Sequence, residues 1–423
     1  MSITISFSMR PRKNWLPGQG WNTEKMQEFA VKLAGEMGYT CDVVGEYAVY
    51  QFCPEGFLWM GFKAGRILGE CQTNIAGPGF HAAVIHFLEL FAARGELGLY
   101  VEDATGYYEE RDFIKMRRNY FYQWFTDLMG QVLEKKDETG EQLVCWPADY
   151  YLPEEHKDMI TTHIRRFAIS EIAGMMRSGM SMAFARDFFI WNAEEKDAYY
   201  YRNSALVMLN QECYFMPSLR SREDQDINDK IISLLERALS MKPDIPFPKK
   251  EYLELCALAE HKPVDVDGVT EYAREIEIGC RKGLLFRTIG CMRFAVPGNY
   301  LYDSNSRGNS ERYYDGMKKG GHEFYICAIN TPGNADFQEA PFQKDTVQEV
   351  QEFRTGETKG KIAVYRPVER DGKTVHSVAA QMIYKNQMTI VSINYENPDD
   401  RAWAFDLIRK VQAVEDTDDK RDV

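Results

Sequence analysis

The pattern of apolar and polar positions predicts that the first hundred residues form mainly short strands and two helices. Alternation with a period of two predicts the strands, and the separators 54–56 and 64–65 are short enough to imply antiparallel neighbours. Apolar residues three and four apart predict helices over 23–37 and 80–93, the first capped by Asn22 or Thr23. The expected strands are 1–7, 40–44, 47–52, 57–63, 66–73 and 97–102.

The middle of the chain has the longer spacing that is typical of amphipathic helices. Pairs of large apolar residues that step by four predict a long helix over 110–135 with a broad buried face. A helix is also expected over 155–177, because Ile160, Ile164 and Phe167 would fall on one side of it. Further helices are expected over 194–214, from behind Asp226 to just before Pro243, and over 248–261.

Alternation returns near the C-terminal end and predicts strands over 361–368, 374–384 and 387–395. The pair Asp371-Gly372 between the first two strands is typical of a two-residue hairpin turn, because both residue types tolerate positive φ. The segment 397–400 combines a capping Asn, a Pro and two Asp residues, so it predicts the start of a final helix.

These elements predict an α+β fold in which two modules, each an antiparallel sheet with helices, flank a helical middle region. The 423 residues exceed one core, since single cores stop growing at roughly 250–300 residues. Within the middle region, 235–243 resembles the second helix of a tetratricopeptide unit, although no period of about 34 residues repeats it. The expected divisions are an N-terminal domain 1–150, a helical region 151–263, a C-terminal domain 264–414 and an acidic tail 415–423.

Charge and composition favour some classes of binding partner over others. The formal net charge of −13 argues against binding to nucleic acid or to an anionic membrane, because both attract basic surfaces. No run of the sequence approaches the roughly 20 apolar residues that a membrane-spanning helix needs. Aromatic residues make up 13% of the chain, which leaves Tyr and Trp available for a binding face.

The nine cysteines are scattered and form no C-x-x-C pair, whereas zinc ribbons and disulfide frameworks need close, regular spacings. We therefore expect buried, reduced thiols, with no metal and no cofactor. The N-terminal residues have no basic segment followed by an apolar one, so no export signal is expected. A reducing cytoplasm is the expected location.

The sequence lacks four signatures that assign enzyme classes directly. These are the phosphate-binding G-x-x-x-x-G-K-[ST], the zinc-binding H-E-x-x-H, the nucleophile motif G-x-S-x-G and a dinucleotide-binding glycine fingerprint behind a strand. Their absence from the sequence lowers the expectation of an NTPase, a zinc protease, a serine hydrolase or a dinucleotide enzyme.

The densest group of polar and ionisable residues surrounds the Gly-Pro-Gly bend at 77–79, before the helix over 80–93. Glycines allow a sharp turn there, and free N–H groups at a helix N-terminus attract anions. The strand over 97–102 can return further polar residues to the same edge. The ligand-binding candidates are Asn74, Gly77, Gly79, Tyr107 and Tyr108, and the catalytic candidates are His81, Asp103 and Arg111.

Two interpretations of this corner stay open. In one, His81 is a general base with a carboxylate partner, and Arg111 or the helix N-terminus holds a small anionic substrate. In the other, the polar residues only close the fold, since Asp103 or Thr105 can close a loop and Asp112 suits the start of the next helix. Ordinary turn and cap chemistry accounts for the second interpretation, which we favour.

Two further groups of residues are candidates. His156 and His163 are seven residues apart and would share a helical face, but metal-binding helices offer ligands three or four apart, so an exposed pair is expected. The polar segment 303–315 and the residues after it predict a long loop. Its candidate binding residues are Arg307, Arg312 and His322.

We therefore expect a non-catalytic, cytoplasmic interaction or scaffold protein with an aromatic, acidic face for a protein partner. The missing enzyme signatures, the tetratricopeptide-like helix and the net charge of −13 support this hypothesis. The alternative is an enzyme or binding protein for a small anionic ligand at the 74–112 corner. A third hypothesis is a structural subunit whose interface is one of the sheets.

Overall fold

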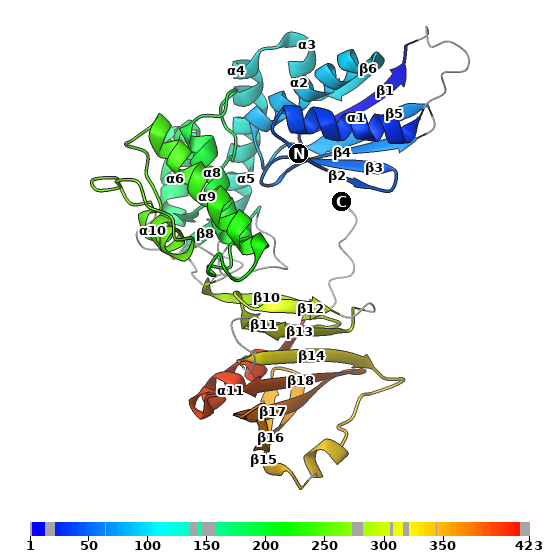
Figure 1. The fold of residues 1–423 in the computed structure, drawn as a ribbon, viewed down its shortest axis with the longest axis vertical. Coiled ribbons are helices and arrows are strands. Elements are labelled where there is room, and N and C mark those ends of the chain that lie inside the picture. Colours follow the sequence, from blue (N-terminus) through cyan, green and yellow to red (C-terminus); the bar gives the residue numbers. More distant parts are fainter. Residues whose placement is uncertain are drawn as a thin grey trace. The chain divides into compact units, whose positions relative to one another are not determined.

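The computed structural model describes residues 2–12, 22–63, 65–135, 142–145, 158–272, 282–304, 308–315, 321–343 and 345–414. The chain divides into two compact units. The first contains Met1–Trp146, Glu155–Cys213 and Arg222–Ile278, and the second contains Pro147–Glu154, Tyr214–Ser221 and Gly279–Val423. Both units combine antiparallel sheets with helices, so the predicted α+β class is confirmed (Figure 1).

The first unit contains a six-stranded antiparallel sheet with the strand order β2-β3-β4-β5-β1-β6. The predicted meander is confirmed for β2 to β5, and the connections between these strands are tight turns. The N-terminal strand lies inside the sheet, because β6 returns to pair with it. The strands are β1 (Thr4–Pro11), β2 (Thr40–Val44), β3 (Tyr47–Cys53), β4 (Gly56–Lys63), β5 (Arg66–Gln72) and β6 (Leu97–Asp103).

Helices α1 (Thr23–Glu36) and α2 (Pro78–Arg94) lie on the same face of this sheet (Figure 1). The layer between them is aromatic, because the Phe52 ring of β3 lies 5.5 Å from the rings of Phe80 and Phe87 on α2. The predicted cap of α1 is confirmed, since the Asn22 side chain accepts a hydrogen bond of 2.9 Å from the Lys25 backbone N–H. Large apolar side chains on this face of the sheet are therefore buried.

The helix predicted over 110–135 begins after a break. A short helix α3 (Tyr107–Glu110) ends at Arg111, which has φ 58°, and α4 (Phe113–Met116) continues through a π-helical turn (Arg117–Phe121) into α5 (Tyr122–Lys135). Asp112 caps α4 by accepting a hydrogen bond of 2.9 Å from the Lys115 backbone N–H. The π-helical turn brings the buried Phe121 ring within 5.7 Å of the His81 ring on α2.

The prediction of a helix over 155–177 is wrong for residues 159–168. These residues form two strands and the turn between them. The strands are β8 (Met159–Thr162) and β9 (Arg166–Ala168), and β8 also pairs in parallel with β7 (Gln142–Val144). The spacing of Ile160 and Phe167 suited a helix, but the two residues are instead cross-strand partners and both are buried. Only the end of the predicted helix is helical, as α6 (Ile169–Ser178).

The remaining helices of the first unit follow the predicted order, with the addition of a short one. None of the helices in the described residues is both long enough and apolar enough to cross a lipid bilayer. The helices are α7 (Ser181–Ala185), α8 (Ala198–Gln211), α9 (Arg222–Met241) and α10 (Lys249–Leu258).

In its described residues, the second unit contains two antiparallel sheets, one α-helix and two short 3₁₀ helices (Ala340–Gln343 and Pro398–Asp400). Its larger sheet has the order β12-β13-β14-β18-β17-β16-β15, and its smaller sheet has the order β10-β11-β19. The strands are β10 (Leu284–Ile289), β11 (Met292–Pro297), β12 (Leu301–Ser304), β13 (Ser310–Tyr314), β14 (Glu323–Asn330), β15 (Val347–Thr355), β16 (Thr358–Arg370), β17 (Lys373–Tyr384), β18 (Gln387–Tyr395) and β19 (Gln412–Ala413), and the helix is α11 (Arg401–Arg409).

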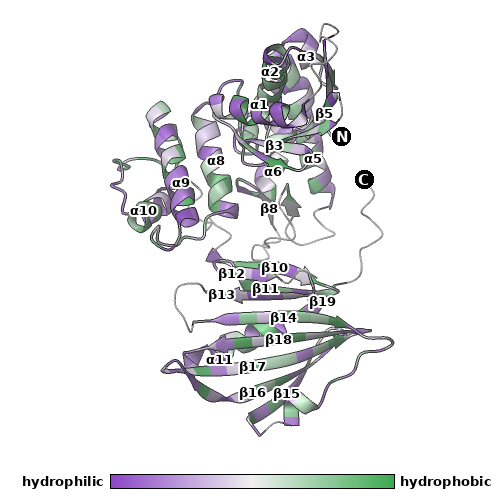
Figure 2. Ribbon diagram, turned by 45° about the vertical axis from the view of Figure 1, so that its right-hand side comes forward, coloured by the Kyte–Doolittle hydropathy of each residue, from purple (hydrophilic) through white to green (hydrophobic). Residues whose placement is uncertain are grey.

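The predicted β16–β17 turn and the predicted start of the final helix are confirmed. The long loop predicted over 303–315 is wrong, because β12 and β13 pair as antiparallel strands there. Asp371 and Gly372 form the β16–β17 turn with φ of 52° and 77°. Asn397 accepts a hydrogen bond of 3.1 Å from the Asp399 backbone N–H, just before α11. Hydrophobic and hydrophilic residues alternate along the strands (Figure 2), and the apolar side chains build one core with α11.

Candidate functional site

The predicted corner is a closed cluster at the ends of β5, α2 and β6. His81 is fully buried. Its Nδ1 lies 3.0 Å from the Thr73 hydroxyl, and its Nε2 lies 3.3 Å from the Thr105 hydroxyl and 3.2 Å from Asp103 Oδ1. The structure therefore brings His81 and Asp103 together, but solvent does not reach the imidazole ring. A general base needs contact with substrate, and this arrangement gives none.

Asp103 is bound to the loop that follows β6. Its carboxylate accepts hydrogen bonds of 2.8 Å from the Thr105 backbone N–H and hydroxyl and of 2.9 Å from the Tyr108 backbone N–H. Burial raises the pKa of Asp103, but the hydrogen bond and charge of His81, together with these backbone N–H groups, outweigh burial and hold the pKa well below its ordinary value. Asp103 thus closes a loop as an ionised carboxylate.

The Gly-Pro-Gly bend is occupied by another part of the chain. The Gly79 backbone N–H donates to the Trp191 carbonyl at 2.9 Å, and the Trp191 N–H donates to the Ala76 carbonyl at 2.8 Å. A Cβ added at Gly79 would lie 2.0 Å from the Trp191 ring, and Gly77 has φ 108°. The glycines therefore allow close packing of two backbones, and the Gly79 N–H at the start of α2 is already taken.

The other candidates of the corner are also engaged within the fold. Asn74 is buried and accepts a hydrogen bond of 2.8 Å from the Ile3 backbone N–H. The Tyr107 hydroxyl donates to a Glu194 carboxylate oxygen at 3.4 Å. Arg111 forms an ion pair with Glu89, and its guanidinium lies 5.2 Å from the Tyr108 ring centroid. Arg111 therefore joins a surface carboxylate of α2 rather than the buried His81.

The other candidates belong to the second unit, and Arg312 lies on strand β13 rather than in a loop. Arg307 lies outside the described residues. Arg312 forms an ion pair with Glu323 and lies 5.5 Å from the Tyr314 ring centroid. His322 Nε2 lies 2.7 Å from Asp400 Oδ2 at the start of the last helical segment. The structure thus gives each described candidate an acidic partner.

The expected exposed pair of histidines is not found in the described part of the chain. His156 lies outside the described residues, and His163 lies in the turn between β8 and β9, where it is fully buried. Its ring lies 5.4 Å from the Phe188 ring. No group of three or more His, Cys, Asp or Glu side chains that could hold a metal ion occurs among the described residues.

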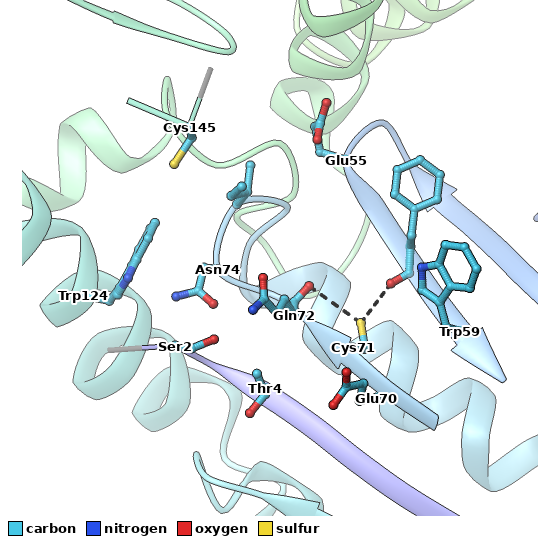
Figure 3. Close-up of a pocket in the computed structure, with 12 residues that line it drawn as sticks. Ser2, Thr4, Glu55, Trp59, Glu70, Cys71, Gln72, Asn74, Trp124 and Cys145 are labelled. Carbon is cyan, nitrogen blue, oxygen red and sulfur yellow. Dashed lines mark hydrogen bonds between the residues drawn. The ribbon is translucent and has the colours of Figure 1, made fainter. Parts of the chain in front are cut away.

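An open cavity lies instead beside the strand ends of the six-stranded sheet, with a volume of about 610 Å³. Figure 3 shows Trp124 of α5 and Trp59 of β4 on opposite sides of it, with Glu55 from the β3–β4 turn at its edge. The lining is aromatic, acidic and neutral polar. It consists of Ser2, Thr4, Glu55, Phe57, Trp59, Glu70, Cys71, Gln72, Asn74, Ile75, Trp124 and Cys145.

The side chains that line the cavity carry a net negative charge. Neither Glu55 nor Glu70 forms an ion pair with a described residue, and no lysine or arginine is among the described residues that line the cavity. The charge of Glu55 acts on its neighbours: burial and then Glu55 raise the pKa of Cys145 to about 12. Burial raises the pKa of Glu212, Lys230 lowers it, and Glu55 raises it further, with a net increase.

The cavity continues onto the outer face of the sheet, opposite α1 and α2. One row of cross-strand partners on this face runs Val49, Trp59, Glu70, Ser6 and Glu102, from β3 to β6. A shallower hollow shares Trp59 and Glu70 with the cavity. The aromatic side chains exposed on this face are Tyr47 (47%), Phe57 (41%), Trp59 (53%) and Tyr100 (60%). We call these four residues the aromatic face.

The sequence predicted an aromatic, acidic face, but its pattern did not identify these four residues. The strand Gly56–Lys63 carries large apolar residues at both parities, so alternation could not separate the buried Leu58 and Met60 from the exposed Phe57 and Trp59. One signal was available. Tyr47, Phe57 and Trp59 lie on the same face of the sheet as charged or polar residues of the neighbouring strands. Using it requires the strand register, which only the structure gives.

Comparisons with known proteins add little. No protein-family model and no curated protein matches the chain. A crystal structure of a protein from Bacteroides thetaiotaomicron VPI-5482 aligns at 15% identity over 32% of this chain and 50% of that chain, with a TM-score of 0.25. The solution structure of cyanobacterial PsbP (CyanoP) from Synechocystis sp. PCC 6803 aligns at 8% identity over 31% of this chain and 94% of that chain, with a TM-score of 0.26. Likeness at these TM-scores supports no statement about this chain.

Proposed function

We propose that this chain is a non-catalytic, cytoplasmic protein-interaction protein that binds a partner protein on the outer face of its six-stranded sheet. The observation that carries the proposal is the aromatic face, whose four exposed rings share the outer face of the sheet with Glu70, Glu102 and the basic Lys63. Tyr and Trp are enriched at protein interfaces because they bury a large rigid area and keep a polar end. The free thiols of the described residues fit a reducing compartment.

Charge selects the kind of partner. Glu70 and Glu102 flank Ser6 in one cross-strand row, and Glu55 lies at the cavity end of the face. The whole chain carries a formal charge of −13. A partner segment that is basic and contains apolar residues complements this surface, whereas a second copy of the chain would be repelled.

The corner at 74–112 supplies no observation that favours the alternative function, an enzyme or binding protein for a small anion. His81 is buried, Arg111 is paired with Glu89 and the Gly79 N–H is bonded to Trp191. The interaction hypothesis therefore rests on the sheet face alone, and experiments directed at that face test it.

The test uses the intact protein as bait and compares two variants. Proteins retained by the wild type are identified, purified and titrated against it, first at low and then at high salt. We expect the double variant Trp59→Ala, Tyr100→Ala to weaken the affinity of the true partner by about tenfold or more, because buried aromatic anchors dominate interface energies. The affinity should also fall as salt rises, since the surfaces are oppositely charged.

Tyr302→Ala is the matched control, because Tyr302 is similarly exposed, at 47%, but lies on β12 in the second unit. It should leave the affinity of the partner unchanged. A partner that binds the Trp59→Ala, Tyr100→Ala variant and the Tyr302→Ala control with equal affinity would contradict the proposal. Self-association of the wild type that the double variant abolishes would show that the face serves a second copy instead.

A further inference from the structure

The cavity at the edge of the aromatic face has two aromatic walls and a polar floor. Trp59 of β4 and Trp124 of α5 come from different elements and lie on opposite sides of it (Figure 3). The Trp124 ring is supported from behind by Phe188 and Phe189, at centroid distances of 5.9 Å and 6.2 Å. A ring held in this way offers a fixed surface against which a flat group can stack.

The carboxylates and hydroxyls of the cavity can accept hydrogen bonds from a donor group. The carboxylates of Glu55 and Glu70 accept only, and no described lysine or arginine among the lining residues neutralises them. The hydroxyls of Ser2 and Thr4 and the amide oxygen of Gln72 provide further acceptors.

We infer that this cavity holds the guanidinium group of an arginine side chain from the partner's basic segment. This inference rests on the proposed partner-binding function and names the group that the site recognises. A guanidinium is planar, permanently charged and rich in donors, so it can stack on an indole ring and pair with a carboxylate at the same time. The volume of about 610 Å³ also leaves room for the methylene stem and the adjoining backbone.

The geometry favours arginine over other small groups. A lysine ammonium would satisfy the carboxylates, but it has no planar head that could stack on an indole ring as a guanidinium does. A sugar could stack on the indole rings and bond to the hydroxyls, but it would leave the charge of Glu55 and Glu70 uncompensated. Arginine is the side chain that can combine stacking on an indole ring with pairing to a carboxylate.

The test measures binding of short peptides to the intact protein labelled with 5-fluorotryptophan. The probes are acetyl-Gly-Arg-Gly-amide and its Lys, Gln and Glu counterparts, together with the neutral disaccharide maltose. Variants Trp59→Phe and Trp124→Phe assign the two fluorine resonances. We expect the arginyl peptide to shift both resonances with saturation at millimolar concentration, and the Gln and Glu peptides to cause no shift.

Charge-neutralising variants locate the binding site. Glu70→Gln and Glu55→Gln should each weaken binding of the arginyl peptide by about three- to tenfold. Glu109→Gln is the matched control, because Glu109 is exposed on α3 and loses the same charge outside the cavity. It should bind the arginyl peptide as the wild type does.

Three results would overturn the inference: no saturable shift with the arginyl peptide, equal binding of the Gln peptide or maltose, or equal affinities of the Glu70 and Glu109 variants. Each of these leaves the proposed function standing if Trp59→Ala, Tyr100→Ala still weakens the partner. The two failures are therefore distinguishable. Partner binding that is insensitive to the aromatic face, with the arginyl peptide still bound, would overturn the proposed function while keeping the cavity as a guanidinium site.

Discussion

His163 shows how far burial can change the chemistry of one residue. Burial lowers the pKa of its imidazole to about 3, against a smaller opposing effect of the Phe188 backbone, while the unfolded chain keeps a value near 6.5. Below pH 6.5, His163 therefore binds a proton in the unfolded state but not in the folded state. Unfolding becomes easier as pH falls from about 6.5 toward 3, by up to about 1.4 kcal/mol per pH unit from this residue.

We expect His163→Leu to remove this part of the pH dependence. Denaturant unfolding at pH 7, 6 and 5 measures it, because the difference in unfolding free energy between variant and wild type should change in favour of the variant as pH falls. His86→Leu is the control, since His86 is exposed on α2. A difference that is the same at all three pH values would show that the folded and unfolded states bind a proton at His163 equally, so that folding does not lower its pKa.

Residue-scale features were predictable from sequence where they depend on near neighbours. The cap of α1 by Asn22 and the turn at Asp371-Gly372 follow from rules that reach a few residues along the chain. The candidate site was not predictable in the same way. Gly79 was read as part of an anion site, but its N–H is taken by Trp191, which is remote in the sequence.

At the scale of elements, the segment 155–177 shows where periodicity fails. Ile160, Ile164 and Phe167 fit one face of a helix, yet the turn between β8 and β9 separates them. The Thr162 side chain holds that turn: its hydroxyl donates to the Arg165 carbonyl at 2.7 Å and accepts from the Arg165 N–H at 3.0 Å. A local side-chain bond of this kind competes with the helical pattern, and spacing does not reveal it.

We therefore expect Thr162→Val to destabilise the first unit by about 1–3 kcal/mol, because the buried hydroxyl is lost while the backbone groups of Arg165 stay in place. Thr126→Val on α5 is the matched comparison. Its hydroxyl donates to the Tyr122 carbonyl within the same helix, so its loss should cost much less. Denaturant unfolding measures both. Equal costs would mean that the β8–β9 turn does not depend on Thr162.

At the scale of the whole molecule, the sequence predicted the α+β class and the order of most elements, and it placed divisions at residues 150 and 264. The positions of those divisions stay predictions. The structure suggests how to test them, because a segment that contains a complete hydrophobic core can fold as a separate domain. Among the described residues, the hydrophobic cluster that joins the sheets of the second unit to α11 lies between Leu285 and Val411. The core of the first unit instead joins α2 and α5 to Phe188, Phe189 and Trp191.

We expect a fragment of residues 282–414 to fold alone and to unfold in one cooperative transition, because every residue of its buried core is present. A fragment of residues 1–150 should fail to fold stably, since it loses the Phe188 and Phe189 rings that pack on Phe125 and the Trp191 backbone that bonds Gly79. Extending it to residue 272 should restore folding. Circular dichroism melting of the three fragments measures this. A stable, cooperative 1–150 fragment would show that the sheet with α1 and α2 is a domain by itself.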